Sequence, residues 1–178
     1  MRRLATGERI RELFRRLGQR TRQPATIYLT GGATAVLLGW RESTIDVDLK
    51  LVPDRDELLR LFPELKESLE INIELASPDL FIPVPPGWEE RSPWETTEGA
   101  LVVRHFDLTA QALSKVERWH DRDRFDVAEM IRLRLVTTAA LRDCFESIEP
   151  FLFRFPAIDA ESLRRRVEQV VADLAADG

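Results

Sequence analysis

Two aspartates separated by one residue are the side chains of this sequence best suited to hold a metal ion. Asp46 and Asp48 lie in the segment 45–51, where apolar residues alternate with charged ones. That period of two predicts a half-buried strand with both carboxylates on one face, roughly 6–7 Å apart along the strand. Mg²⁺ is typically held by one or two protein carboxylates together with substrate phosphate oxygens. An isolated Asp-x-Asp is also a common solvated strand face, so its sequence context decides between the two interpretations.

A glycine pair precedes the aspartates. Gly31 and Gly32 follow a short β-rich segment and precede an apolar stretch of good helix formers, 33–38. This order predicts a strand, a glycine turn and a helix that leads into the aspartate strand. The missing side chains let backbone N–H groups approach a phosphate, although a tight turn required for packing would use glycine equally well. The combination with Asp46 and Asp48 favours phosphate binding.

These residues together resemble a known motif. Leu29-Thr-Gly-Gly32, thirteen intervening residues and Asp46-Val-Asp48-Leu are similar to the pattern of the DNA polymerase beta-like nucleotidyltransferase superfamily. The resemblance implies two metal carboxylates on one strand, a third on a later strand, bound Mg²⁺ or Mn²⁺, and a nucleoside triphosphate such as ATP as substrate. Glu74 stands where the third carboxylate is expected, and an exposed strand glutamate is the alternative.

A closer likeness is to the minimal nucleotidyltransferases of bacterial toxin-antitoxin systems, including toxins of the abortive-infection AbiE type. Arg41-Glu-Ser-Thr44 resembles the arginine and threonine of that family just before the acidic pair. Lys115 and Arg122-Asp123-Arg-Phe-Asp126 fill the places of its later lysine and Arg-Asp-x-x-Asp run. The resemblance covers roughly residues 25–130. It implies that Arg41, Thr44 and Lys115 contact the nucleotide and that Asp126 orients the lysine or the triphosphate.

Lys115 and Asp126 both lie in segments with a helical period. If one helix spanned them, the eleven-residue step would be about three turns and would place both on one face, with Arg122 nearby. The sequence Trp119-His120-Asp121 is a candidate break in such a helix. The alternative role for Lys115, Asp123 and Asp126 is a salt-bridge network on a charged helix.

The pattern of elements predicts an α+β fold, in which a small mixed sheet with an N-terminal helix is followed by a helical bundle. We expect strands over 25–30, 45–51, 71–75 and 100–106. We expect helices over 6–18, 33–38, 54–69, 108–119, 125–136, 139–148 and 159–174. Pro63 is expected to kink or end the helix that opens at 54. The proline-rich segment 77–93 reads as a long ordered loop anchored by Trp88. Residues 1–106 are the predicted nucleotidyltransferase core, and 107–178 are the predicted helical region.

The charge of the chain gives no strong general attraction to nucleic acid or to anionic membranes, because 26 basic residues face 31 acidic ones. The one basic segment is 1–22, which contains eight arginines and two glutamates. Its apolar residues fall on one helical face, so we favour an amphipathic packing helix over a nucleic-acid contact. These apolar residues are Ile10, Leu13, Phe14 and Leu17.

Several classes of protein gain no support. Cys144 is the only cysteine, so an intrachain disulfide is excluded and a reducing cytoplasm is the expected location. We expect neither a membrane span nor a signal peptide, because the required apolar runs are missing. His105 and His120 lack ligand-spaced partners and are expected to be structural or surface residues. Hydrolase-elbow and P-loop motifs are absent from the sequence.

The expected reaction is nucleotidyl transfer from a nucleoside triphosphate to a hydroxyl group. The resemblance implies an acceptor at a tRNA 3′ end or on a cognate toxin or antitoxin protein. Two other classes remain open at this point. One is a catalytically degenerate protein of the same fold that binds a nucleotide or a partner, such as an antitoxin, and the other is a plain interaction module.

Overall fold

The computed structural model describes residues 3–174, which form two compact units. The first unit comprises 3–77 and 92–106, and the second comprises 78–91 and 107–174. Residues 78–91 group with the helices of the second unit. The reason is local pairing, because Nε of Arg91 donates to Oδ2 of Asp107 at 2.7 Å.

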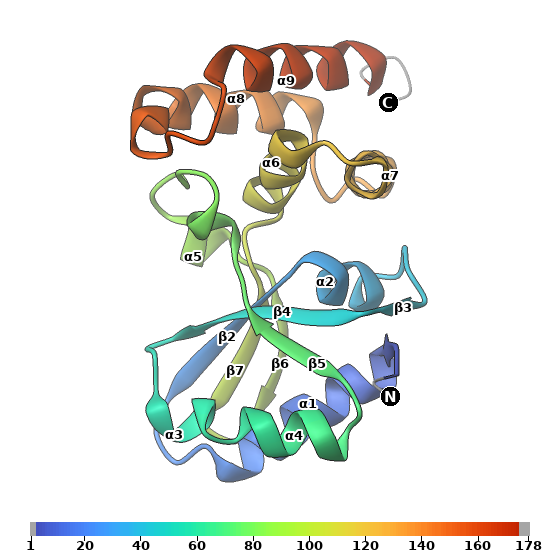
Figure 1. The fold of residues 1–178 in the computed structure, drawn as a ribbon, viewed down its shortest axis with the longest axis vertical. Coiled ribbons are helices and arrows are strands. Elements are labelled where there is room, and N and C mark those ends of the chain that lie inside the picture. The colour runs from blue at the N-terminus through green and yellow to red at the C-terminus, as the bar shows by residue number, and fades with distance from the viewer. Residues whose placement is uncertain (1–2, 175–178) are drawn as a thin grey trace. The chain divides into compact units, whose positions relative to one another are not determined.

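A mixed five-stranded sheet forms the centre of the first unit (Figure 1). In order of adjacency its strands are β5 (Asn72–Leu75), β4 (Asp46–Val52), β2 (Ala25–Thr30), β7 (Leu101–His105) and β6 (Trp94–Glu98). β4 runs antiparallel to β2 and parallel to β5, while β7 runs parallel to β2 and antiparallel to β6. The strand that carries the aspartates is therefore flanked on both sides.

Helices α1 (Gly7–Arg20), α3 (Asp56–Leu59) and α4 (Phe62–Ser68) pack against the sheet within the first unit (Figure 1). The amphipathic helix predicted near the N-terminus is confirmed, because its four apolar residues are fully buried. Its arginines pair with carboxylates: Arg16 lies 2.8 Å from Glu12, and Arg20 lies 2.7 Å from Glu64. Arg2 lies outside the described residues. The arginine face of α1 is thus in large part an ion-pairing surface.

The core explains the alternation of β4. Val47, Leu49 and Leu51 are buried together with residues of α1, α4, β2 and β7. Because side chains alternate along a strand, the intervening Asp46 and Asp48 must lie on the opposite face. Because the apolar side chains of β4 are buried in the core, the two aspartates are held on the opposite face of the sheet.

Several elements were not predicted from the sequence. They are β6 and the short antiparallel pair of β1 (Ala5–Thr6) and β3 (Ser43–Thr44). The segment 77–93, expected as a loop, contains the short helices η1 (Pro78–Leu80) and α5 (Trp88–Arg91). The break expected at Pro63 is present, because the segment 54–69 is divided into α3 and α4 and Pro63 occupies the first turn of α4. The other strands and helices that were predicted lie within a few residues of their predicted bounds.

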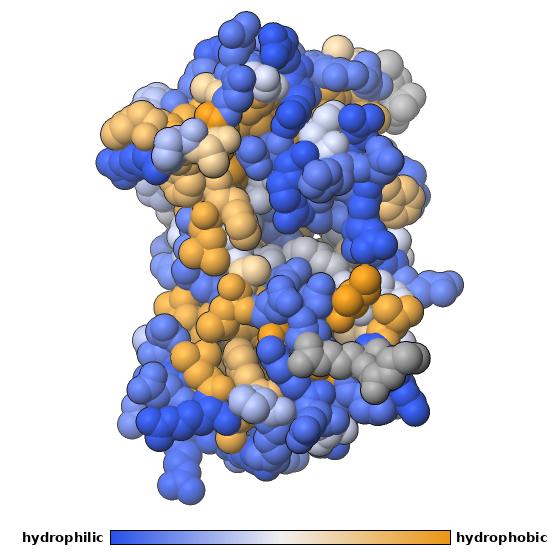
Figure 2. Space-filling view, viewed as in Figure 1, coloured by the Kyte–Doolittle hydropathy of each residue, from blue (hydrophilic) through white to orange (hydrophobic). Residues whose placement is uncertain are grey.

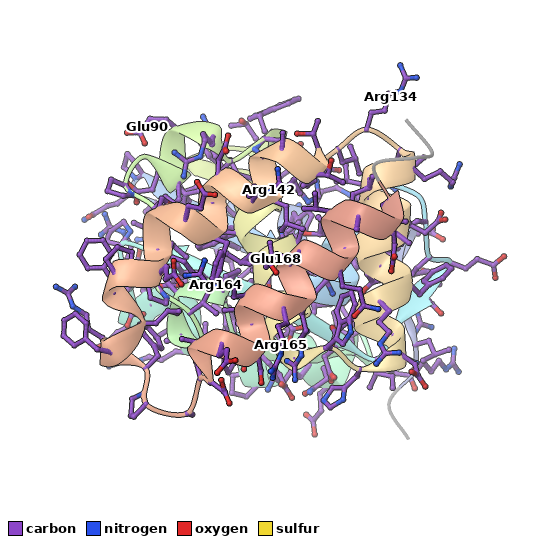
Figure 3. All side chains as sticks on the ribbon, turned by 90° about the horizontal axis from the view of Figure 1, so that it is seen from above. Glu90, Arg134, Arg142, Arg164, Arg165 and Glu168 are labelled. Atoms are coloured by element: carbon purple, nitrogen blue, oxygen red, sulfur yellow. The ribbon has the colours of Figure 1, made fainter. Side chains whose placement is uncertain are left out.

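The second unit is helical. Its elements are η1 (Pro78–Leu80), α5 (Trp88–Arg91), α6 (Leu108–Arg118), α7 (Asp121–Arg132), α8 (Thr138–Ile148), η2 (Glu149–Arg154) and α9 (Ala160–Leu174). α6 packs against α7, α8 and α9 around buried Leu113, Val127, Met130, Leu141, Phe145, Leu163 and Val167. On the outward surface, exposed Arg142, Arg165 and Glu168 show a mixture of charges on α8 and α9 (Figure 3).

The predicted α+β class with a mixed sheet is confirmed. Across residues 3–174, none of the helices combines the length and the apolar character needed to cross a membrane. Cys144 is buried in α8, and this burial raises the pKa of its thiol to about 12. The thiol is therefore protonated and unreactive near neutral pH.

Candidate functional site

The glycine pair lies against the strand segment that carries the aspartates. Gly31 begins α2 (Gly31–Leu37) with a φ of +58°, and a Cβ placed on it would lie 2.7 Å from Oδ2 of Asp48. A Cβ on Gly32 would overlap Oγ1 of Thr44. A side chain at Gly31 would displace the Asp48 carboxylate, and a side chain at Gly32 would displace Thr44. Glycine is therefore favoured at both positions by these close contacts, and at Gly31 also by the turn. The backbone at Gly31 therefore lies directly against the Asp48 carboxylate.

The strand register gathers polar side chains on the sheet face opposite the core. Asp48 is paired with Thr30 of β2 and with Glu74 of β5, and Asp46 is paired with Asn72 of β5. Paired residues of neighbouring strands share a face, with Cβ atoms about 4.5–5.5 Å apart. Asp46 and Asp48 therefore lie on one face, as their spacing predicts, and the register places Glu74 on that same face.

Asn72 joins two of these carboxylates. Its Nδ2 donates to Oδ1 of Asp46 at 2.8 Å and to Oε1 of Glu74 at 2.6 Å. The amide end between two carboxylate oxygens must be the NH₂ group, because the amide oxygen can only accept hydrogen bonds. The alternation of β5 places Asn72 beside Glu74, but only the pairing of β5 with β4 reveals its contact with Asp46. Sequence reasoning therefore missed it as a site residue.

Arg41 and Thr44 lie between α2 and β4, as the order of the motif requires. Thr44 is buried, and its Oγ1 donates to the backbone carbonyl of Asp46 at 3.1 Å. Together with its close approach to Gly32, this bond fixes the start of the aspartate strand. Arg41 is half-buried, and its backbone N–H donates to the carbonyl of Ala35 at 3.2 Å. The structure thus shows a positional role for Thr44 and places Arg41 in the preceding loop.

Two basic residues extend the polar face of the sheet. Lys50 follows Asp48 by two residues on β4, and its strand partner Tyr28 is paired in turn with Arg104 of β7. Both basic residues are half-buried. Nη1 of Arg104 donates to the carbonyl of Ser92 at 2.7 Å. Within the first unit, the face therefore passes from acidic to basic, which suits a metal ion and an anionic ligand on neighbouring strands. The alternation along β4 is enough to place Lys50 on this face from sequence, whereas Arg104 can be placed there only once the pairing of β2 with β7 is known.

The donors of this face fit a hard divalent cation. Asp46 and Asp48 offer two carboxylates on one face, and Gly31 lies close against the carboxylate of Asp48. Mg²⁺ needs only one or two protein carboxylates when water and substrate phosphates complete its coordination. Among residues 3–174, no three His, Cys, Asp or Glu side chains are grouped so that they could hold a metal ion. Water and substrate oxygens would therefore have to supply most of the coordination of a cation held by the two aspartates.

Lys115 and Asp126 form a buried ion pair within the second unit. Nζ of Lys115 lies 2.7 Å from Oδ2 of Asp126, and the two side chains are 6% and 0% exposed. They lie on separate helices, because Trp119 ends α6 in the left-handed conformation and His120 caps α7. The candidate break at Trp119-His120-Asp121 is thus confirmed, and one helix across the whole region is excluded. Such a helix would have separated the two residues by about 16 Å along its axis, whereas the break brings them into contact.

Asp123 completes a charged network around this pair. It lies 3.8 Å from Lys115 and accepts a hydrogen bond from Arg118 at 2.8 Å. Arg122 is exposed. The salt-bridge network considered from sequence is thus present. It contains Asp123 and also Lys115 and Asp126, the two residues to which the resemblance gives a functional role.

The two histidines occupy structural positions. His105 is buried in the first unit, with Nε2 3.0 Å from Oε2 of Glu95 and Nδ1 3.1 Å from Oγ1 of Thr34. Burial lowers the pKa of His105, and the Glu95 carboxylate opposes this effect. His120 serves as the cap of α7. Neither arrangement indicates a metal ligand.

A separate groove lies beside α3 and α4 of the first unit. Its volume is about 790 Å³, and Leu59, Phe62 and Leu75 supply part of its lining. Figure 2 shows apolar and hydrophilic side chains intermixed on the visible face of this unit. Asp46 and Asp48 do not line this groove. The candidate site is thus a polar sheet face next to a glycine turn.

The chemistry available in the first unit is the binding of a cation and of phosphate oxygens. Gly31 and Gly32 provide close backbone access, Asp46 and Asp48 provide hard anionic ligands, and Lys50 adds a positive charge. Comparisons of the chain with models of protein families, with curated proteins and with solved structures gave no match.

Proposed function

We propose that this chain is a metal-dependent nucleotidyltransferase, which moves a nucleoside monophosphate from a nucleoside triphosphate to a hydroxyl group. The observation that carries the proposal is the approach of Gly31 to Asp48, where a Cβ would lie 2.7 Å from the carboxylate. An Asp-x-Asp on a solvated surface would not need a glycine next to its carboxylates. A site in which phosphates contact both the backbone and the metal-binding carboxylates does need a glycine there, because a side chain would keep the backbone away.

Asp46 and Asp48 would hold Mg²⁺ or Mn²⁺, with Glu74 as the proposed third carboxylate. Such a cation, when bound, neutralises charge on the phosphates and polarises the α-phosphate. Gly31 and Gly32 let the backbone lie close to the metal carboxylates and to the triphosphate, and the two carboxylates orient the reacting group. The acceptor oxygen forms a bond with the α-phosphorus, the bond from that phosphorus to the bridging oxygen breaks, and pyrophosphate leaves. The hydroxyl proton passes to a site carboxylate or to water.

Arg41, Thr44, Lys115 and Asp126 enter the proposal through the resemblance to toxin-antitoxin nucleotidyltransferases. Thr44 acts by fixing β4, since its hydroxyl donates to the carbonyl of Asp46 at 3.1 Å. Lys115 is proposed to neutralise phosphate charge, and its contact with Asp126 at 2.7 Å fixes the ammonium group. Arg41 is proposed as a further nucleotide contact.

The proposed acceptor is the 3′ end of a tRNA or a hydroxyl of a cognate toxin or antitoxin protein. We place this activity in the cytoplasm, where nucleoside triphosphates, Mg²⁺ and both acceptors are available. The exposed arginines of α1 are not needed for this proposal, because several of them pair with glutamates.

A second candidate function is nucleotide or partner binding without turnover. Two observations favour it. Residues 3–174 contain no group of three or more His, Cys, Asp or Glu side chains arranged to hold a metal ion, and Lys115 is already engaged in a buried ion pair. Such a protein would bind a nucleotide or a partner protein but would transfer nothing.

The decisive experiment is a transfer assay with labelled nucleoside triphosphates, total tRNA and candidate partner proteins. We expect label to appear in one acceptor with Mg²⁺ or Mn²⁺ and to disappear for the double variant Asp46→Asn with Asp48→Asn. Metal-dependent nucleotide binding without transfer to any acceptor would instead support the second candidate. Nucleotide binding that ignores both the metal and the double variant would refute the catalytic candidate.

A further inference from the structure

Asn72 is the only asparagine among the 178 residues, and it occupies a distinctive position. It lies on the edge strand β5, directly opposite Asp46 in the parallel pairing with β4. Its Nδ2 contacts Oδ1 of Asp46 at 2.8 Å and Oε1 of Glu74 at 2.6 Å. One neutral side chain therefore connects the first aspartate of the acidic pair to the proposed third carboxylate.

This bridge restrains how far apart the two carboxylates can lie. Because both oxygens accept from the same nitrogen, their separation cannot exceed the sum of the two hydrogen-bond distances. Two ionised carboxylates at such a separation repel each other. The two N–H groups of the amide offset that repulsion, since hydrogen bonds to charged acceptors are stronger than neutral ones. The amide thus holds an arrangement that the carboxylates would not keep alone.

We propose that Asn72 is a positioning residue of the metal site, which holds Asp46 and Glu74 toward one another so that both can serve the same cation. This inference rests on the proposed metal-dependent function. Asn72 acts through its neighbours, because the NH₂ group that faces the carboxylates has no lone pair to donate to a metal. Removing such a supporting group typically costs about 10–100-fold in metal affinity.

The first test measures Mn²⁺ binding by electron paramagnetic resonance on the full chain. We expect Asn72→Ala to bind Mn²⁺ about tenfold or more weakly than the wild type. The matched control is Thr96→Ala, which truncates another half-buried polar side chain on the opposite edge strand, β6. We expect this control to bind Mn²⁺ as the wild type does. Equal affinity of Asn72→Ala and the wild type would overturn the inference, as would tighter binding by Asn72→Ala.

The second test needs no variant of Asn72. Since the chain has one asparagine, labelling with ¹⁵N-asparagine yields a single side-chain NH₂ signal pair in a two-dimensional NMR spectrum. We expect Mg²⁺ to shift this pair and Mn²⁺ to broaden it, and we expect Asp46→Ala to abolish both responses. An NH₂ signal that ignores both cations would overturn the inference.

The outcomes separate this inference from the proposed function. Mn²⁺ that does not bind the wild-type chain would overturn both. Weakened Mn²⁺ binding by Asn72→Ala, with no nucleotidyl transfer to any acceptor by the wild type, would uphold the positioning role and remove the catalytic proposal.

Discussion

The Cα of Gly31 lies so close to the side chain of Asp48 that a Cβ would stand 2.7 Å from Oδ2. The residue also has a φ of +58°. Two separate demands, a left-handed backbone and an approach to a carboxylate, therefore fall on one glycine. Gly39 meets only the first demand, because its φ is +96° and a Cβ there would contact nothing within 4 Å.

This difference makes Gly31→Ala and Gly39→Ala a matched pair. Both variants should lose about 1–2 kcal/mol of the free energy of unfolding, because alanine disfavours the left-handed conformation. Only Gly31→Ala should also weaken Mg²⁺-dependent nucleotide binding, since its methyl group displaces the Asp48 carboxylate. Urea denaturation and isothermal titration calorimetry measure the two effects. Equal nucleotide affinity of the two variants would contradict the proposed role of the glycine turn.

The buried pair of Lys115 and Asp126 predicts a double-mutant cycle. Lys115→Met alone should lower the free energy of unfolding by about 3–5 kcal/mol, because it leaves the Asp126 carboxylate buried beside one fewer positive charge. Adding Asp126→Leu should recover much of that loss. A coupling energy near zero in urea denaturation would contradict this account of the pair.

The same double variant tests the catalytic role of Lys115. We expect the folded Lys115→Met and Asp126→Leu variant to show no nucleotidyl transfer, because it lacks the ammonium group proposed to neutralise the triphosphate. Transfer at the wild-type rate would assign the pair to stability alone.

His105 predicts a pH-dependent stability. Burial lowers its pKa below 6.5 in the folded state, so the unfolded chain binds a proton more readily. The contribution of His105 to the free energy of unfolding is therefore complete above pH 6.5 and declines as the pH falls below that value. We expect the free energy of unfolding to fall between about pH 7.5 and about pH 5.5, and to fall less steeply in His105→Gln. Equal slopes for the two proteins in urea denaturation would refute the assignment.

Much of the fold follows from local patterns. The period-2 run around Asp46 and the glycine turn before it predict β2, α2 and β4, because a buried core selects alternate positions on a strand. β6 escaped prediction because Trp94-Glu-Thr-Thr-Glu98 is an edge strand with no apolar alternation. The turn at Gly99, which has a φ of +62°, and the two threonines are the signals that could have revealed its hairpin with β7.

The site was less accessible from sequence than the fold. Asn72 and Arg104 join the face of Asp48 only through strand pairing, and no spacing within one strand encodes the pairing of another. The contact of Lys115 with Asp126 depends on a helix break at Trp119, a residue with no strong preference for the left-handed conformation it adopts here. Non-local pairing and one unusual backbone conformation therefore account for what the sequence could not show.

The most direct test of the central claim is nucleotide binding by calorimetry, with and without Mg²⁺, for the wild type and for the double variant Asp46→Asn with Asp48→Asn. If these aspartates hold the metal of a nucleoside triphosphate, the wild type will bind at least one triphosphate only when Mg²⁺ is present. The double variant, with an unchanged thermal unfolding midpoint, will lose that binding. Triphosphate binding of equal affinity in both proteins, with or without Mg²⁺, would contradict the claim.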